Sequence, residues 1–230
     1  MPQPDEASPI EALAFTRGSS PRRRRYGRLR QDNPTTLDRT GDAEQPTRWL
    51  SAAAIGTARG RVLEIGVGSG LNLPLYGAAV ERVCGIYPSP ELLGRASGRM
   101  ADARVPVSLV RASAEQLPFA EGAFDSVVMT WTLCSIPNPS TALSEMRRVL
   151  NSNGRLVFVE HGLSPEPRIV RWQRRLTPFW KRIGGGCHLD RKMDDLIRAA
   201  GFRVDALETG YMRGPKPWTF MYQGTATPAA

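Results

Sequence analysis

A short glycine-rich segment is the part of this sequence best suited to hold a bulky ligand against the main chain. The apolar run Val62–Ile65 carries one carboxylate, Glu64, and leads directly into Gly66-Val67-Gly68-Ser69-Gly70. Glycine permits tight turns and a close approach of ligand to backbone, and the N–H groups of a following helix can face that ligand. The segment therefore predicts a cofactor site built from a strand, a turn and a helix.

Alternating strand and helix signals surround this segment. Short apolar runs predict strands at Arg61–Ile65, Arg82–Ile86, Val107–Val110, Phe124–Trp131, Arg155–Glu160, Phe202–Leu207 and Thr219–Tyr222. Helices are predicted from Pro46 and at Leu73–Ala79, Pro90–Met100, Ser140–Leu150 and Arg191–Ala200, with a turn at Asn151–Gly154. Strands separated by helices are typical of parallel βαβ units with helices on both faces of the sheet. We therefore expect an α/β domain over residues 45–226.

The spacing of the glycines also points to a family. In the usual dinucleotide motif the third glycine comes one position later, whereas the run from Glu64 to Gly70 resembles the first motif of class I S-adenosylmethionine-dependent methyltransferases, in particular the type 11 methyltransferase domain. Similar segments follow in the expected order at Leu71–Leu73, Gly85–Pro90, Ala114–Phe119, Phe124–Val128 and Met146–Leu150. Glu160-His161 and Gly185-Gly186-Cys187-His188 further resemble a subgroup related to alkyl-thiol and small-molecule methyltransferases.

This resemblance implies a Rossmann-like, seven-stranded, mostly parallel sheet whose last strand is antiparallel, with S-adenosylmethionine as cofactor. Gly66, Gly68 and Gly70 would line the methionine and ribose portion of the cofactor, and Glu64 would lie beneath its amino-acid end. The full set of implied cofactor residues is Glu64, Gly66, Gly68, Gly70, Asn72, Tyr87, Ser113, Ala114, Glu115, Thr130 and Trp131. The alternative role for Glu64 is a strand-end carboxylate that only caps the glycine loop.

Tyr87 departs from the family pattern. The second strand should end on an acidic residue that accepts both ribose hydroxyls, but Tyr87 stands there. A phenol makes one neutral hydrogen bond and cannot chelate a diol, so cofactor binding should be weaker by about 1–2 kcal/mol.

Two histidines are the candidate catalytic residues. Methyl transfer from a sulfonium requires an aligned acceptor, and a thiol, phenol or hydroxyl acceptor also requires a base. His161, at the predicted end of the fifth strand, is the first candidate base; it could instead hydrogen-bond a loop carbonyl. His188, which follows Cys187, would contact substrate from a lid, or Cys187 and His188 would only hold a turn. Two histidines and three scattered cysteines predict no metal site.

The segment Ile169–Ile183 carries Trp172, Leu176, Phe179 and Trp180 among several arginines. It could rest on a membrane surface and admit a lipophilic substrate. The alternative, which we favour, is a helix whose aromatic residues form one stripe that packs on the domain.

Composition narrows the remaining choices. The formal net charge is +9, with arginines concentrated at residues 22–30 and 168–182, and residues 1–44 are predicted to form a flexible basic arm. Three widely spaced cysteines, no long apolar run and no export signal predict a cytoplasmic protein. The sequence leaves the oligomeric state open.

We favour an enzyme that methylates a small lipophilic acceptor through a thiol, hydroxyl or amine. The basic arm would suit an RNA methyltransferase, but Trp131-Thr132-Leu133-Cys134 stands where many such enzymes have Asn/Asp-Pro-Pro-aromatic, so no specific nucleic acid is expected. Tyr87 would suit a third class, a non-catalytic S-adenosylmethionine-binding protein.

Overall fold

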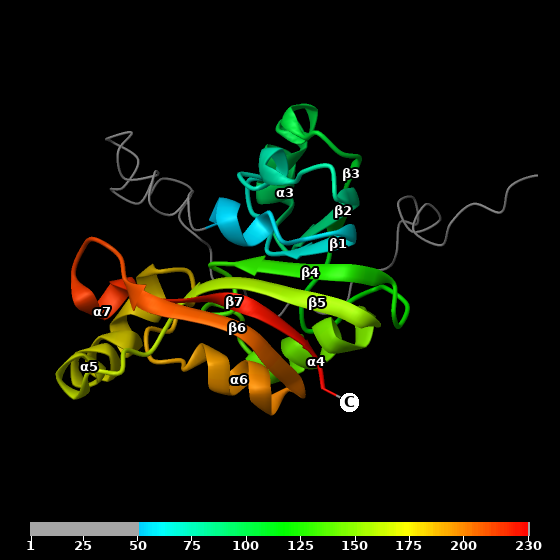
Figure 1. Ribbon diagram of the computed structural model, residues 1–230. Helices are drawn as coiled ribbons and strands as arrows, with labels where there is room; N and C mark the ends of the chain where they lie inside the picture. Colours follow the sequence, from blue (N-terminus) through cyan, green and yellow to red (C-terminus); the bar gives the residue numbers. More distant parts are fainter. Residues whose placement is uncertain (1–50, 230) are drawn as a thin grey trace, which may run out of the picture.

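One mixed sheet organises residues 51–229, which are the residues that the structure, a computed structural model, describes. Its strands are β1 (Gly60–Ile65), β2 (Val80–Tyr87), β3 (Val107–Arg111), β4 (Phe124–Thr130), β5 (Leu150–His161), β6 (Phe202–Tyr211) and β7 (Phe220–Pro228). They lie in the order β3-β2-β1-β4-β5-β7-β6 (Figure 1). The first five pair in parallel, and β7 is antiparallel to both β5 and β6. The expected Rossmann-like, mostly parallel sheet is confirmed. The predicted arm over residues 1–44 lies outside the described residues.

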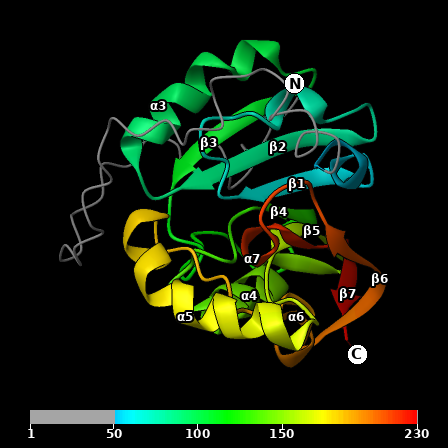
Figure 2. The same cartoon turned by 90° about the vertical axis from the view of Figure 1, so that its left-hand side faces the viewer.

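Helices cover both faces of the sheet. They are α3 (Pro90–Gly98), α4 (Pro139–Val149), α5 (Pro167–Ile183), α6 (Met193–Ala199) and the short α7 (Lys216–Thr219). Residues 51–55 are also helical, within the helix predicted from the sequence, whose predicted start at Pro46 lies outside the described residues. Met146 of α4 and Ile197 of α6 belong to one buried cluster, whereas Ile55 and Tyr76 belong to a second. Figure 2 shows α3 on one side of the sheet and α4, α5 and α6 on the other.

Two sequence predictions were wrong in their extent. The helix predicted at Leu73–Ala79 is a single 3-10 turn, Leu73–Leu75, because Tyr76 is extended (φ −70°, ψ 125°). The turn predicted at Asn151–Gly154 lies inside β5, where the pairing with β4 jumps between Phe124 and Ser126. These polar residues therefore form a bulge inside β5, whereas their composition alone predicts the end of a strand.

The parallel pairing brings the carboxyl ends of the central strands to one edge of the sheet. Ile65 of β1 pairs with Ile86 of β2 and with Met129 of β4, and Thr130 pairs with Val159 of β5. The segments that follow β1, β2, β4 and β5 therefore meet at this edge, which is where ligands bind in open α/β sheets.

Candidate active site

The glycine turn after β1 combines tight packing on one side with open space on the other. Gly66 has a φ of +75°, and a Cβ there would overlap the Thr132 side chain. At Gly68 (φ +55°) the nearest atom to an added Cβ is the Gly66 carbonyl oxygen, 3.7 Å away. Gly70 is closed in by α3, where an added Cβ would lie 3.1 Å from the Ala96 Cα. The turn is therefore fixed by packing at Gly66 and Gly70, and Gly68 faces the space that a ligand can occupy.

Glu64 lies at the base of this turn. Its side chain is buried and accepts hydrogen bonds from Asn72 Nδ2 at 2.8 Å and from the Tyr76 hydroxyl at 3.0 Å. Asn72 also donates to Thr130 Oγ1 at 2.9 Å, so three of the predicted cofactor residues form one network. Burial raises the pKa of Glu64 to about 7, against the lowering effect of both hydrogen bonds. A buried carboxylate held by neutral donors is well placed to accept a cation such as an ammonium group.

Tyr76 is a site residue that the sequence did not identify. It is fully buried, and its hydroxyl donates to Glu64 Oε2. The expectation of a helix through residues 73–79 placed Tyr76 among packing residues. The signal that could have found it was a tyrosine within reach of a buried acid, because a buried phenol needs a partner.

The residues expected around the ribose and adenine follow β2 and β3. Tyr87 is partly buried at the end of β2, and burial raises its phenol pKa, so the ring carries no charge. Ser113 forms an isolated bridge with Gln116, and its Oγ accepts from the Glu115 N–H at 3.2 Å. Ala114 is partly buried and packs against the first core cluster. The Glu115 carboxylate accepts from the Asn138 N–H at 2.6 Å, which ties it to the start of α4.

Replacing Tyr87 by aspartate is expected to tighten S-adenosylmethionine binding about tenfold, because an anionic acceptor for a diol is worth roughly 1–2 kcal/mol more than a phenol. Calorimetric titration of the variant with the cofactor measures this. If the affinity does not rise, another group already holds the ribose.

The loop after β4 is held from two sides by a buried acidic residue and a partly buried arginine. Glu160 on β5 is buried, and its carboxylate accepts from the N–H groups of Thr132 (2.7 Å), Leu133 (2.9 Å) and Cys134 (3.4 Å). Arg191 donates to the carbonyl oxygens of Leu133 and Ile136 at 2.6 and 2.7 Å. The loop conformation is thus fixed through its own backbone. These roles of Glu160 and Arg191 were not predicted from the sequence, although an acidic residue within the apolar run of β5 was a signal for the first of them.

This loop begins with a strained residue beside His161. Trp131 has a φ of +55°, in the left-handed region that costs a non-glycine residue about 1–2 kcal/mol. Its ring centroid is 6.1 Å from that of His161. The next residue, Thr132, donates its hydroxyl to the Thr130 carbonyl at 2.8 Å and lies 3.3 Å from the Ile65 carbonyl. Its side chain also fills the space beside Gly66, so the loop packs directly on the end of β1 and the glycine turn.

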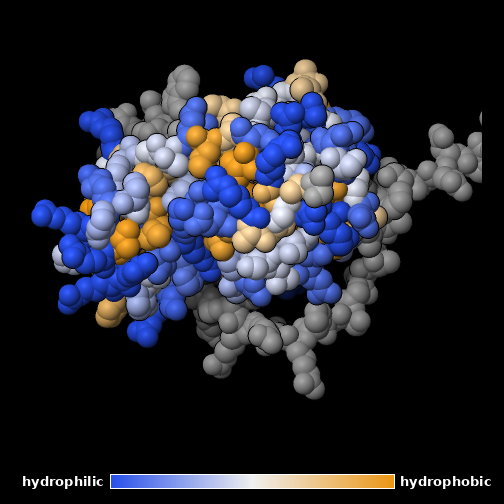
Figure 3. Space-filling view, turned by 60° about the horizontal axis from the view of Figure 1, so that its bottom comes forward, coloured by the Kyte–Doolittle hydropathy of each residue, from blue (hydrophilic) through white to orange (hydrophobic). Residues whose placement is uncertain are grey.

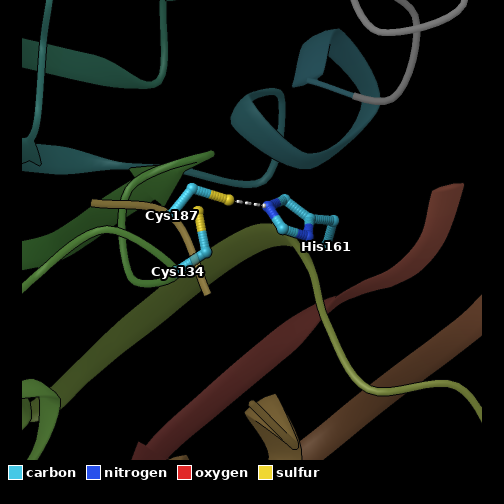
Figure 4. Close-up of side chains that lie close together, drawn as sticks. All are labelled: Cys134, His161 and Cys187. Atoms are coloured by element: carbon cyan, nitrogen blue, oxygen red, sulfur yellow. Dashed lines mark hydrogen bonds between the residues drawn. The ribbon is translucent and has the colours of Figure 1, made fainter. Parts of the chain in front are cut away.

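Three side chains that are distant in sequence meet at this edge. Cys134 comes from the loop after β4, His161 ends β5, and Cys187 follows α5 (Figure 4). His161 Nε2 lies 2.9 Å from Cys187 Sγ, and the three potential ligand atoms lie within 4.8 Å of one another. All three residues are buried. We call this group the Cys134–His161–Cys187 cluster. The sequence placed His161 at the end of its strand as expected but treated the cysteines as scattered.

The cluster favours a charged pair of thiolate and imidazolium. Donation from the Cys134 thiol and the contact with His161 hold the pKa of Cys187 below its usual range, against the effect of burial. Burial lowers the pKa of His161, but the contact with Cys187 and the charge of Glu160 outweigh it and raise that pKa. Cys134 keeps its proton, since its donation to Cys187 and its burial raise its pKa well above the usual value. The group can therefore hold a proton or a cation.

His188, the second predicted catalytic residue, lies beside the cluster without joining it. Its N–H donates to the Cys134 carbonyl at 2.8 Å, but its ring is partly exposed and Nδ1 lies 3.8 Å from the Asp190 carboxylate. Cys187, its neighbour in sequence, supplies the side chain that meets His161.

Comparisons with known proteins identify the same segments. Residues 63–158 match a family model described as a methyltransferase domain. Thiol S-methyltransferase TMT1B of Rattus norvegicus is 35% identical over 151 residues, which are 64% of this chain and 62% of the rat protein. The same enzyme of Homo sapiens is 36% identical over 173 residues, 73% of this chain and 69% of the human protein. Phosphatidylethanolamine N-methyltransferase of Cereibacter sphaeroides is 35% identical over 146 residues, 63% of this chain and 71% of the bacterial protein. The chain thus spans about two thirds of the length of these relatives.

Solved structures share the fold at lower identity. A S-adenosylmethionine-dependent methyltransferase of Methanosarcina mazei superposes with a TM-score of 0.59 and 22% identity, covering 74% of this chain and 92% of the other. The [4+2]-cyclase SpnF superposes with a TM-score of 0.63 and 19% identity over 82% of each chain. Since a cyclase shares it, the fold by itself does not fix the reaction.

Proposed function

Because the chain belongs to the family of S-adenosylmethionine-dependent methyltransferases, we propose that it methylates the thiol of a small lipophilic molecule at the Cys134–His161–Cys187 cluster. The observation that carries this proposal is a buried group of sulfur and imidazole side chains whose loop packs on the glycine turn. The name of the TMT1B relatives, thiol S-methyltransferase, supports the same acceptor class.

Different residues bind the cofactor and remove the proton of the acceptor thiol. The glycine turn and Glu64 hold the cofactor, and the loop after β4 contacts the glycine turn through Thr132 and contributes Cys134 to the cluster. A neutral thiol is a poor nucleophile, so its proton must leave before or during attack on the methyl carbon. His161 is the candidate that takes it, in the form of the pair in which Cys187 holds the shared proton and the imidazole is neutral. As the new S–CH₃ bond forms, the C–S bond of the sulfonium breaks and its electron pair stays on the cofactor sulfur.

Replacing His161 by alanine is expected to lower turnover about a hundredfold, which is the usual loss when a proton-transfer group is removed. The affinity for S-adenosylmethionine should change by less than about threefold, a difference below 1 kcal/mol, because Glu64 and the glycine turn remain. Steady-state kinetics and calorimetry measure the two effects. His188→Ala is the matched control and should lose less activity; an equal loss in both variants would contradict the assignment.

The acceptor is tested with matched compounds that differ in one atom. An alkyl or aryl thiol, the corresponding alcohol and the corresponding amine are each incubated with protein and cofactor, and release of S-adenosylhomocysteine is followed. The proposal expects the thiol to react at least ten times faster than the alcohol. Faster methylation of the amine or alcohol would overturn the thiol assignment.

A second acceptor class, the amine of a phospholipid, is favoured by the outer face of α5. Trp172, Phe179 and Ile183 are exposed by 56%, 69% and 77%. They recur at intervals that place them on one stripe of a helix. The inner face instead buries Gln173, whose amide donates to the Gly162 and Pro217 carbonyls. The sequence analysis favoured a stripe packed on the domain, and Leu176 and Trp180 do pack there, but the other apolar residues face outward.

Basic side chains flank this exposed stripe. α5 carries six of them and no acidic residue: Arg168, Arg171, Arg174, Arg175, Lys181 and Arg182. In Figure 3 hydrophobic residues lie among hydrophilic ones on the left-hand side, where α5 runs. Within the described residues, no helix is both long and apolar enough to cross a bilayer. We include in the proposal that α5 rests on an anionic membrane surface, where a lipophilic acceptor would be concentrated.

Sedimentation with phosphatidylglycerol vesicles tests the α5 contact. Wild-type protein should sediment with these vesicles and less with phosphatidylcholine, and Phe179→Ser combined with Trp172→Ser should weaken binding at least about fivefold, roughly 1 kcal/mol. Leu71→Ser removes an exposed leucine away from α5 and should have no effect. Equal binding by all three proteins would contradict the α5 contact. Methyl transfer to phosphatidylethanolamine vesicles but not to thiols would establish the second acceptor.

The proposal also includes the cytoplasmic location predicted from the sequence. The free cysteines Cys84, Cys134 and Cys187 support a reducing, cytoplasmic compartment. The family membership favours an enzyme over the non-catalytic binder that Tyr87 suggested. The RNA alternative rested on the basic arm, which lies outside the described residues.

A further inference from the structure

The Cys134–His161–Cys187 cluster has the composition of a zinc site. Thiolate sulfur and neutral imidazole nitrogen are the ligands that Zn²⁺ prefers, and catalytic zinc sites keep three protein ligands with a fourth position open. Two cysteines and one histidine meet this requirement. The whole chain contains only two histidines and three cysteines, so three of its five residues of these kinds lie in one cluster.

The distances are close to those that a tetrahedral ion requires. Zinc bonds of about 2.3 Å to sulfur and 2.0–2.1 Å to nitrogen place adjacent ligand atoms about 3.6–3.8 Å apart. The three ligand atoms already lie within 4.8 Å of one another. The 2.9 Å contact between His161 Nε2 and Cys187 Sγ would have to open by about 0.7 Å, which side-chain rotation can supply.

The elements that carry the ligands are fixed independently of any ion. Glu160 and Arg191 hold the backbone around Cys134. His161 ends the central strand β5, where it pairs with Met221 of β7. The segment of Cys187 is joined to the loop after β4 by the hydrogen bond from the His188 N–H to the Cys134 carbonyl. A ligand set held in this way loses little freedom when an ion binds.

Hydrogen bonding alone does not explain why His161 is buried. Its Nδ1 is buried without a hydrogen-bond partner among the described residues, and Nε2 has only the contact with Cys187. Nε2, which has only the contact with Cys187, would gain a stronger partner if an ion bound there, whereas the unpaired Nδ1 would keep the cost of its burial.

We propose that Cys134, His161 and Cys187 bind one Zn²⁺ ion and that the acceptor thiol takes its fourth coordination position. The second half of this inference rests on the proposed thiol acceptor; the first half does not. Coordination removes the thiol proton, which passes to solvent, and the bound thiolate attacks the methyl carbon of the sulfonium. The products are a thioether and S-adenosylhomocysteine, and the ion keeps its charge throughout. With the ion bound, His161 acts as a ligand and the proton passes to solvent; without an ion, the base role proposed above for His161 applies.

Metal binding by the full-length protein tests the site without any substrate. Protein stripped with a chelator is dialysed against micromolar Zn²⁺, and bound metal is measured by mass spectrometry. We expect one equivalent in the wild type. Cys134→Ser, Cys187→Ser and His161→Ala should each weaken binding at least about tenfold. Cys84→Ser and His188→Ala are matched controls outside the cluster and should bind as the wild type does. Less than a tenth of an equivalent in the wild type, or full binding by Cys187→Ser, would overturn the inference.

Cobalt substitution keeps the test independent of whether the variants fold. Co²⁺ bound to two thiolates gives wild-type protein an intense near-ultraviolet charge-transfer band, and its absence would also overturn the site. Adding an acceptor thiol should change this spectrum. An unchanged spectrum would remove the fourth-ligand role and leave the ion site in place. Failure to bind zinc together with methylation of thiols would overturn the metal site alone and leave the proposed function standing.

Discussion

Replacing Glu64 by glutamine is expected to weaken S-adenosylmethionine binding ten- to a hundredfold at pH 8. The carboxylate is buried and its two visible partners, Asn72 and Tyr76, are neutral donors. The ammonium group of the cofactor would form an ion pair with the Glu64 carboxylate. A charge-assisted hydrogen bond of this kind is worth about 1.5–3 kcal/mol. Glutamine keeps the shape but not the charge; its Oε1 can still accept from Asn72, while its Nε2 would donate to the Tyr76 hydroxyl instead of accepting from it. Calorimetric titration of the two proteins measures the loss.

The same substitution should stabilise the cofactor-free protein at pH 8. The pKa of Glu64 is about 7 in the folded protein, above the ordinary value of 4.5, so folding favours its protonated form. The free energy of unfolding should therefore fall as the pH rises from about 4.5 to about 7, by on the order of 3 kcal/mol. Glu64→Gln removes this loss. Cofactor binding to the wild type should tighten over the same pH range, since it requires the carboxylate.

Thermal unfolding at pH 5 and pH 8 tests the direction of this pH dependence of stability. Without cofactor, Glu64→Gln should exceed the wild type in melting temperature at pH 8 and match it at pH 5. A variant that is less stable at pH 8 would show that Glu64 serves only to cap the glycine loop, which was the alternative role that the sequence left open.

Replacing Glu160 by alanine is expected to destabilise the protein by about 3–5 kcal/mol. The change leaves the N–H groups of Thr132, Leu133 and Cys134 without their acceptor inside the protein and leaves Arg191 close to an empty space. Each unpaired buried donor costs about 1–3 kcal/mol. For a domain of this size the melting temperature should fall by roughly 6–20 °C. Denaturant unfolding followed by circular dichroism measures the free energy directly.

Glu160→Gln is the matched control. Thr132 and Leu133 both donate to Oε1, and a glutamine carbonyl in that position keeps both bonds while losing only the longer one to Cys134. This variant should lose less than half as much stability as the alanine variant. If Glu160→Ala unfolds within 1 kcal/mol of the wild type, the loop is held by other contacts and the role assigned to Glu160 is wrong.

The parts of the fold that local sequence patterns determine were predicted well. The strands before and after the glycine turn and helix α4 follow from apolar spacing, and α4 begins at a proline after Asn138, whose side chain accepts from the Thr141 N–H. The motif resemblance also placed Glu64, Asn72 and Thr130 in one site, and the structure joins them through hydrogen bonds.

Contacts between distant segments were the part that local patterns did not predict. Tyr76 leaves the helical conformation because its hydroxyl reaches a carboxylate on β1, which residues 73–79 alone do not reveal. Cys187 lies 26 residues from His161 in sequence, and no spacing rule links them. Only the crossover through α5, which brings the chain back to the end of β5, makes them neighbours. Because Cys134 and Cys187 are also far apart in sequence, no local pattern indicated that they lie together.

Cofactor affinity at two matched glycines tests most directly whether the turn after β1 holds S-adenosylmethionine. Gly68 and Gly122 both have positive φ angles, +55° and +67°, and an added Cβ would have its nearest atoms 3.7 and 3.8 Å away. Alanine at either position therefore carries the same backbone strain of about 1–2 kcal/mol, but only Gly68 faces the proposed cofactor space. Calorimetry should show Gly68→Ala binding the cofactor at least about tenfold more weakly than Gly122→Ala, a difference of 1.4 kcal/mol or more. Equal affinities in the two variants would contradict the account.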